Sequence, residues 1–148
     1  MRESCSKIPN KAHAGNANNR LTPFDDFQKH RHTHGRGDSA EMDGAAWLET
    51  QGYSIIERNV RFAAGEIDVI ALEGDTLCFV EIKARSSRKW GGASFAVGAA
   101  KQRQLARLAS LYLLRRPHRG PCRFDVLAMD GGGEGWTYTL FRNAFEAG

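Results

Sequence analysis

The sequence lacks the features that would assign it to a secreted or membrane-bound class. It has three cysteines, and no two of them are spaced as a Cys-x-x-Cys pair. This argues against a disulfide scaffold and against a cysteine-based zinc site. The N-terminus has no apolar stretch like that of a secretory signal. The longest apolar run, around residues 111–114, falls far short of the roughly 20 residues that a membrane span needs. We therefore expect a cytoplasmic protein without membrane association.

Large apolar residues are scarce in residues 1–38, where Asn, His, Lys, Arg and Gly predominate. Such a segment buries too little apolar surface to offset the entropy of ordering it. The composition therefore predicts a disordered, polar, His-rich extension, followed by one domain at residues 39–148. The histidines of residues 30–34 could bind a metal ion, but nothing fixes a ligand geometry there, and a solvated tail is the simpler interpretation.

From Ser39 onward the hydrophobic periodicity changes repeatedly between the helical and the strand pattern. Helices are predicted at residues 40–51 and 97–116, and the second should bury Leu105, Leu108, Ala109, Leu111 and Tyr112. Strands are predicted at residues 53–62, 66–72, 77–83, 123–129 and 136–141. The order α-β-β-β-α-β-β predicts an α/β domain of the α+β type, with a mixed five-stranded sheet flanked by helices.

The dipeptide Gly74-Asp75 suits a two-residue turn of type II′ between two of these strands. With that turn, residues whose numbers sum to 149 face each other, so Val69 faces Val80 and Asp68 faces Glu81. Because side chains alternate between the two faces of a strand, one face of the hairpin is wholly apolar and should pack on a helix. That face comprises Ile67, Val69, Ala71, Cys78, Val80 and Ile82.

The other face of the hairpin changes from apolar residues near the turn to four ionisable residues, Glu66, Asp68, Glu81 and Lys83. Asp68 opposite Glu81 places like charges together, which is destabilising unless a cation lies between them. A divalent ion such as Mg²⁺ or Mn²⁺, which prefers oxygen ligands, would meet this need and could support phosphodiester hydrolysis. The alternative is a salt-bridged hairpin end that faces solvent.

Acidic and basic residues are segregated along the chain. No Asp or Glu occurs between Ile82 and Phe124. By direct count this interval has eleven basic residues, namely Lys83, Arg85, Arg88, Lys89, Lys101, Arg103, Arg107, Arg115, Arg116, Arg119 and Arg123. Such a segment is typical of a surface that contacts nucleic-acid phosphates, with a solvated basic helix as the alternative. The predicted contacts are Arg85, Arg88, Lys89, Lys101, Arg103 and Arg107.

The stretches GEIDVIA (residues 65–71) and FVEIKAR (residues 79–85) resemble the YraN family of small bacterial proteins. The resemblance continues upstream through Glu41 and residues 45–59, and downstream from Lys101 to the RFDV stretch at residues 123–126. It covers roughly residues 40–145. That family is classed among predicted endonucleases of the restriction-endonuclease-like superfamily. The resemblance thus implies that fold for the domain and a nuclease activity.

The resemblance also implies roles for individual residues. Asp68 is similar to the first metal carboxylate of the superfamily, while Glu81 and Lys83 resemble its Glu-x-Lys element. The backbone carbonyl of Ile82 would be a further metal ligand. Glu66 matches an adjacent acidic position, and Glu41 matches a helix glutamate near the site. One departure is Ala40, where the family usually has Gly.

These observations leave three hypotheses. The leading one is a Mg²⁺- or Mn²⁺-dependent endonuclease that hydrolyses phosphodiester bonds, in DNA rather than RNA and conceivably in branched DNA. The second is a non-catalytic nucleic-acid-binding module on the same fold. The third is a scaffold protein whose basic surface binds an acidic partner. Small nucleases often use two copies to cut both strands of a duplex, so the nuclease hypothesis includes a possible homodimer.

Overall fold

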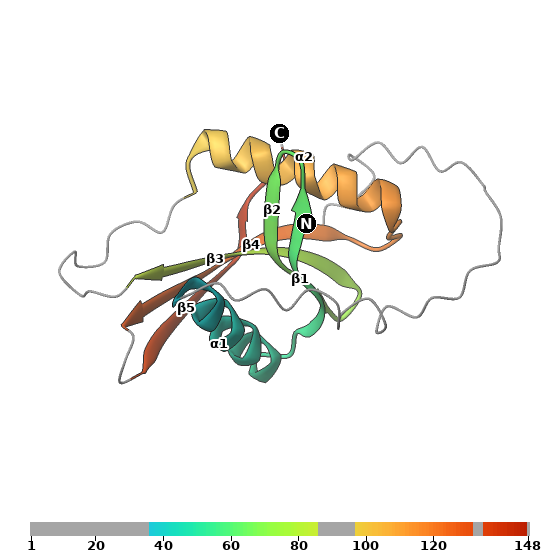
Figure 1. Cartoon of the computed structure of the whole chain (residues 1–148). Helices are drawn as coiled ribbons and strands as arrows, with labels where there is room; N and C mark the ends of the chain where they lie inside the picture. The colour runs from blue at the N-terminus through green and yellow to red at the C-terminus, as the bar shows by residue number, and fades with distance from the viewer. Residues whose placement is uncertain (1–35, 86–96, 132–134, 148) are drawn as a thin grey trace.

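The structure, a computed structural model, describes residues 36–85, 97–131 and 135–147 (Figure 1). Its two helices are α1 (Arg36–Thr50) and α2 (Ala99–Arg115). Its five strands are β1 (Ser54–Phe62), β2 (Gly65–Glu73), β3 (Thr76–Arg85), β4 (Cys122–Gly131) and β5 (Trp136–Phe145). The predicted order α-β-β-β-α-β-β is therefore confirmed. The predicted polar extension lies outside the described residues up to residue 35.

The five strands form one mixed sheet in the order β1-β2-β3-β4-β5. Strands β3 and β4 run parallel, and the other three neighbouring pairs are antiparallel. A parallel pair needs a long connection from the end of one strand back to the start of the next, and α2 lies in that connection. The protein is therefore an α+β domain, as the sequence predicts.

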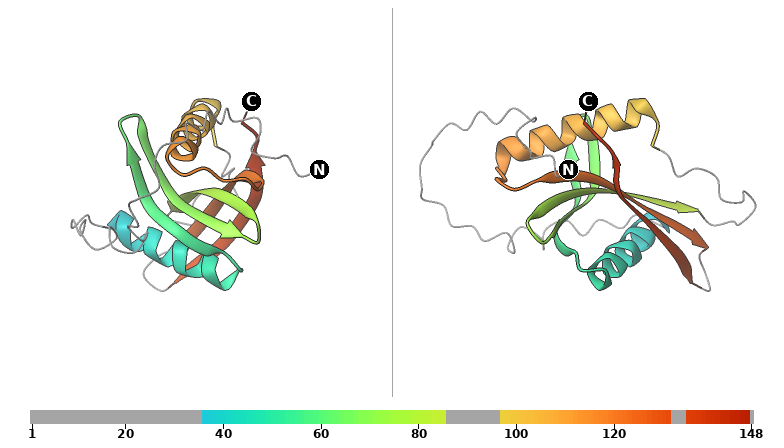
Figure 2. Two further views of the ribbon diagram at one scale, coloured as in Figure 1. Left: turned by 90° about the vertical axis from the view of Figure 1, so that its right-hand side faces the viewer. Right: turned by 180° about the vertical axis from the view of Figure 1, so that it is seen from behind.

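The two helices cover opposite faces of the sheet (Figures 1 and 2). On the α1 side the buried cluster includes Leu48, Val69, Val80, Leu127 and Met129. The cluster on the α2 side includes Ile70, Phe79, Leu105, Leu108 and Val126. Burying both faces of the central strands explains why their sequences read as nearly continuous apolar runs.

Two details of the predicted core are wrong. In α2 the fifth buried residue is Leu113, whereas Leu111 is only partly buried. Ile67 packs in the cluster on the α2 side, although its alternation with Val69 predicts the α1 side. The β1–β2 hairpin curls towards α2 (Figure 1), and Gln104 of α2 donates a hydrogen bond of 2.7 Å to the Ala64 carbonyl at the hairpin tip. This strong twist turns Ile67 to the other side of the sheet.

A buried ionic network joins the sheet to the start of β1. Asp125 on β4 is completely buried. Its carboxylate accepts hydrogen bonds from the Tyr53 hydroxyl at 2.8 Å, from Arg123 Nε at 2.9 Å and from the Asn143 backbone N–H at 2.8 Å. Arg123 also pairs with Glu73 on β2. The carboxylate is thus fully compensated, which is the condition for burying a charge without a large penalty.

Replacing Asp125 by Ala should destabilise the fold strongly, because the Tyr53 hydroxyl and the Asn143 N–H lose their acceptor and Arg123 keeps its ion pair with Glu73 but loses that with Asp125. We expect the free energy of unfolding to fall by about 3–5 kcal/mol in urea denaturation. The exposed Glu146 offers a control, and Glu146→Ala should change stability by less than about 0.5 kcal/mol. Equal stability of the two variants would contradict the structural role of the network.

Candidate metal centre

The site is built where strands β2 and β3 separate. Their antiparallel ladder runs from Glu73↔Thr76 to Val69↔Val80, as the turn at Gly74-Asp75 predicts, and ends there. Beyond that point β2 pairs with β1 as far as Gly65, and β3 pairs with β4 as far as Arg85. The further predicted backbone pairs, such as Asp68 with Glu81, do not form, because the two strands diverge to follow their other neighbours.

Asp68 lies in this fork. Its carboxylate Oδ2 accepts a hydrogen bond of 2.8 Å from the backbone N–H of Ile82. The side chain thus takes the place of the backbone acceptor that the diverging strand no longer offers. This satisfies a buried N–H and fixes the carboxylate at the mouth of the fork.

Three carboxylates meet at this point. Glu41, Glu66 and Asp68 each offer an oxygen, and these oxygens lie within 4.8 Å of one another. Glu66 and Asp68 come from β2, while Glu41 comes from α1 on one face of the sheet. The sequence-predicted acidic residues are therefore brought together, including the helix glutamate. Arg61 on β1 forms an ion pair with Glu66 at 3.1 Å.

Gly44 allows α1 to approach the sheet closely enough for Glu41 to reach this group. A Cβ atom at Gly44 would lie 3.0 Å from Ile82 Cδ1 and 3.0 Å from Met129 Sδ. Residues three apart share a helix face, so Glu41 and Gly44 both face the sheet. The missing side chain therefore sets the depth of α1 and, with it, the position of the Glu41 carboxylate.

Glu81 adds a fourth carboxylate from β3. Its side chain is buried, with 11% of it exposed. Lys101 in the first turn of α2 pairs with Oε1 at 3.3 Å. Among the residues that the structure describes, the buried Oε2 atom finds no hydrogen-bond partner. A buried, ionisable oxygen without a partner is costly, so this atom is a candidate ligand for a cation.

The charges in the fork act on each other. Burial raises the pKa of the Asp68 carboxyl far above its usual value of 3.8, and the neighbouring Glu81 and Glu41 carboxylates raise it further. The hydrogen bond from the Ile82 N–H acts in the opposite direction. A strongly perturbed pKa of this kind marks the fork as a candidate functional site.

The donor set fits a hard divalent cation. Four carboxylates converge from β2, β3 and α1, and Mg²⁺ and Mn²⁺ both prefer oxygen ligands. Glu81 Oε2, which has no hydrogen-bond partner in the part of the chain that the structure describes, is an oxygen ligand of the right kind. On these observations the residues present could hold such an ion at the fork.

A second buried oxygen without a partner within the described ranges is Oδ1 of Asn59 on β1. Asn59 lies between the pairs Arg58↔Val69 and Val60↔Ile67, hence across from Asp68. Its backbone is in the left-handed region with φ of 52°, which Asn tolerates better than most residues. Asn59 was not among the predicted site residues, although an Asn inside a predicted strand is an available signal.

The remaining predicted site residues lie around the fork. Lys83 is partly buried on β3 and forms no ion pair with any described residue. Ile82 provides the N–H to Asp68 and packs partly on the α1 side. Arg85 is the last residue of β3. Arg103 and Arg107 are exposed on α2. Arg88 and Lys89 lie outside the described residues.

Several basic residues of the predicted phosphate surface are engaged inside the protein. Arg116 pairs with Glu57 at 3.1 Å, and Arg123 pairs with Glu73 and Asp125. Lys101 pairs with Glu81. The basic segment therefore contains structural cations as well as exposed ones, a distinction that counting charges along the sequence does not make.

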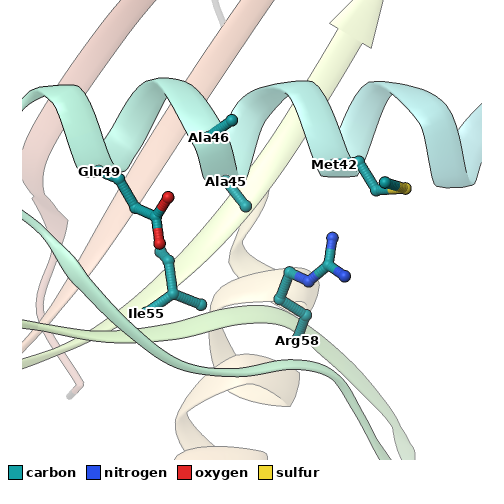
Figure 3. A pocket seen from close by; sticks show the side chains of 6 residues that line it. All are labelled: Met42, Ala45, Ala46, Glu49, Ile55 and Arg58. Atoms are coloured by element: carbon teal, nitrogen blue, oxygen red, sulfur yellow. The ribbon is translucent and has the colours of Figure 1, made fainter. Parts of the chain in front are cut away.

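A pocket of about 290 Å³ lies between α1 and β1, away from the carboxylates. Figure 3 shows Arg58 reaching from β1 towards α1, beside Ala45 and Met42. Glu41, Glu66, Asp68 and Glu81 do not line this pocket. The acidic cluster at the fork and this pocket are therefore separate features, and the pocket belongs to the α1 surface.

No helix among the described residues is long and apolar enough to span a membrane.

The fold and the site together define a class of protein, a small α+β domain with an acidic cluster at a fork in its central sheet. Comparison with known proteins assigns the family. The model of the family described as "Uncharacterised protein family UPF0102" matches residues 40–129, and the chain belongs to that family, which includes YraN.

Individual relatives agree with this assignment. The chain is 51% identical over 113 residues to a UPF0102 protein of Symbiobacterium thermophilum, covering 75% of this chain and 96% of the relative. It is 41% identical to a UPF0102 protein of Janthinobacterium sp. (strain Marseille), covering 75% of this chain and 87% of that protein. For a UPF0102 protein of Alcanivorax borkumensis the identity is 44%, with coverage of 74% and 90%.

The raised pKa of Asp68 predicts a pH-dependent cost in the metal-free protein. Between the unfolded value near 3.8 and the higher folded value, the folded state binds more protons than the unfolded state. Stability should therefore fall as the pH rises through this interval, by up to about 1.4 kcal/mol per pH unit for one proton. Asp68→Asn removes this titration but keeps an acceptor for the Ile82 N–H.

The measurement is urea denaturation of both proteins in EDTA at pH 5, 6.5 and 8. We expect Asp68→Asn to gain stability relative to the wild type as the pH rises. Parallel stability curves for the two proteins would show that Asp68 does not carry the buried charge of this site.

Proposed function

We propose that the protein is a metal-dependent nuclease that hydrolyses phosphodiester bonds in DNA. The observation that carries this proposal is the buried Glu81 Oε2, which has no described partner and lies beside a carboxyl whose ionisation is suppressed. Both features would be relieved by one divalent cation. The family resemblance, with its Asp and Glu-x-Lys pattern, supports the same chemistry.

In this proposal Asp68 and Glu81 hold the ion, with the Ile82 carbonyl as a further ligand and Glu41 and Glu66 close by. The chemistry that Mg²⁺ or Mn²⁺ would supply there is polarisation of the phosphate and a lower pKa for an attacking water. The Ile82 N–H holds the Asp68 carboxylate in place, so that it needs no reorganisation. Lys83, which has no described ion-pair partner, is available to stabilise the charge that develops on the phosphate.

The exposed basic residues of α2 support DNA as the substrate. Arg103 and Arg107 are one helical turn apart and both face solvent. Lys101 lies in the first turn of the same helix and is already beside the acidic cluster through Glu81. Lys101 lies on a different face of α2 from Arg103 and Arg107, so DNA bound to those two arginines would come near the fork only by also reaching the N-terminal end of the helix, where Lys101 lies. Contacts of this kind read phosphates and carry no base specificity.

A cleavage assay tests the catalytic roles. We expect Mn²⁺- or Mg²⁺-dependent cutting of DNA, and a loss of about 100-fold or more in the rate for Glu81→Gln and for Lys83→Met, because each removes a charge from the reacting centre. Linear duplex, single-stranded and four-way-junction DNA, with RNA as a further substrate, would identify the preferred structure. Glu146→Gln is the control for a distant carboxylate.

Absence of cutting on every substrate would contradict the nuclease. If tight, salt-sensitive DNA binding then survived both substitutions, the protein would be the non-catalytic nucleic-acid-binding module instead. The Lys101–Glu81 ion pair favours that second candidate, because it gives Glu81 a partner without any metal.

A binding assay tests the phosphate surface. Arg103→Ala combined with Arg107→Ala should weaken DNA binding to a similar extent for every sequence. It should also reduce the salt dependence of log K by about 2, close to one unit per lost phosphate contact. Arg142→Ala is the matched control, because Arg142 lies on β5 and pairs with Glu73. An unchanged salt dependence in the double variant would place the DNA elsewhere on the protein.

A further inference from the structure

Lys101 occupies an unusual position for a basic residue. It lies in the first turn of α2, where the partial positive charge of the helix N-terminus disfavours a cation. That turn contains no acidic residue, and Gly98 provides no side-chain cap. Local helix energetics therefore do not explain a lysine here, and its contact with Glu81 does.

Lys101 contacts only one of the two oxygens of the Glu81 carboxylate. Lys101 Nζ lies 3.3 Å from Glu81 Oε1, while Oε2 of the same carboxylate is buried and without a described partner. The Lys101 ammonium thus pairs with Oε1, and Oε2 could bind a different cation. The Lys101 side chain is 38% exposed, whereas that of Glu81 is 11% exposed. Lysine can therefore leave the pair towards solvent, and Glu81 stays in the fork.

We propose that Lys101 is a positioning residue that serves as the counter-ion of Glu81 in the metal-free protein, competes with the divalent ion for that carboxylate, and is drawn away by a DNA phosphate. This inference rests on the proposed nuclease function. The role of Lys101 would couple the binding of DNA to the binding of the metal ion. When a DNA phosphate pairs with Lys101, the Glu81 carboxylate loses its ammonium partner and can bind the metal ion more strongly. By linkage, each ligand then tightens the binding of the other.

The first test is a calorimetric titration of the metal-free protein with Mn²⁺ alone. Lys101→Met should bind Mn²⁺ about threefold to tenfold more tightly than the wild type, because the competing charge is gone. Lys101→Arg should remain close to the wild type. Arg116→Met is the matched control, since Arg116 lies just beyond the other end of α2 and pairs with Glu57 at 3.1 Å. It should leave the Mn²⁺ affinity unchanged.

The second test repeats the titration in the presence of a short duplex DNA, with Ca²⁺ as the oxygen-seeking ion. In the wild type, DNA should tighten Ca²⁺ binding about threefold to tenfold, and in Lys101→Met this gain should shrink towards none. If the Lys101–Glu81 contact were only a structural ion pair, Lys101→Met would lower the free energy of unfolding and would change neither the Mn²⁺ affinity nor the Ca²⁺ affinity. Weaker or unchanged Mn²⁺ binding by Lys101→Met, or an undiminished effect of DNA, would overturn the inference.

The outcomes separate this inference from the proposed function. If the wild type binds no Mn²⁺ and cuts no DNA, the nuclease proposal fails and the role of Lys101 falls with it. If the wild type binds Mn²⁺ and cuts DNA, but Lys101→Met shows the wild-type affinity, only the role of Lys101 is wrong. Thermal unfolding of each variant in EDTA confirms that the proteins compared are folded.

Discussion

The hydrogen bond from the Ile82 N–H to the Asp68 carboxylate is the contact on which the candidate site depends. Strands β2 and β3 must separate, because β2 follows β1 in an antiparallel pair and β3 follows β4 in a parallel one. Separation leaves a buried backbone donor without its ladder partner. Asp68 supplies the acceptor, and in doing so it is held where its ionisation is least favourable. The same geometry that completes the sheet therefore creates an acidic site inside it.

The protein balances its buried carboxylates in two different ways. Asp125 is surrounded by donors that include Arg123, Tyr53 and a backbone N–H, so its charge is compensated within the fold. At the fork Arg61 pairs with Glu66, and Lys101 pairs with one oxygen of Glu81. The first arrangement stabilises a fold by itself. At the fork a buried carboxylate oxygen has no hydrogen-bond partner among the described residues, and this contrast is why we propose a function for the fork and a structural role for Asp125.

Much of the fold could be predicted because its signals are local. The turn at Gly74-Asp75 fixed the pairing from Val69↔Val80 to Leu72↔Leu77, and the structure has those pairs. The acidic residues were recognisable from their alternation and from the family pattern. The course of the chain beyond Val69 was not predictable in this way, since a strand's choice between two neighbours depends on the whole sheet. Ile67 was assigned to the wrong face because the twist of the β1–β2 hairpin also depends on the whole fold, and Leu113 was overlooked in favour of Leu111 because the buried face of α2 is set by its packing on the sheet.

The sequence by itself determined the order of the helices and strands and the positions of the acidic and basic segments. It also determined that Glu81 and Lys83 form a Glu-x-Lys pattern. All of these features depend only on residues that are neighbours along the chain. Only the tertiary structure decided which charges meet. Glu41 reaches Asp68 because Gly44 lets α1 settle on the sheet, and Lys101 reaches Glu81 because α2 crosses the opposite face. It also decided that Arg116 and Arg123 are structural cations, whereas Arg103 and Arg107 face solvent. The energy of a charge depends on its burial and on partners distant in sequence, and no local pattern encodes either.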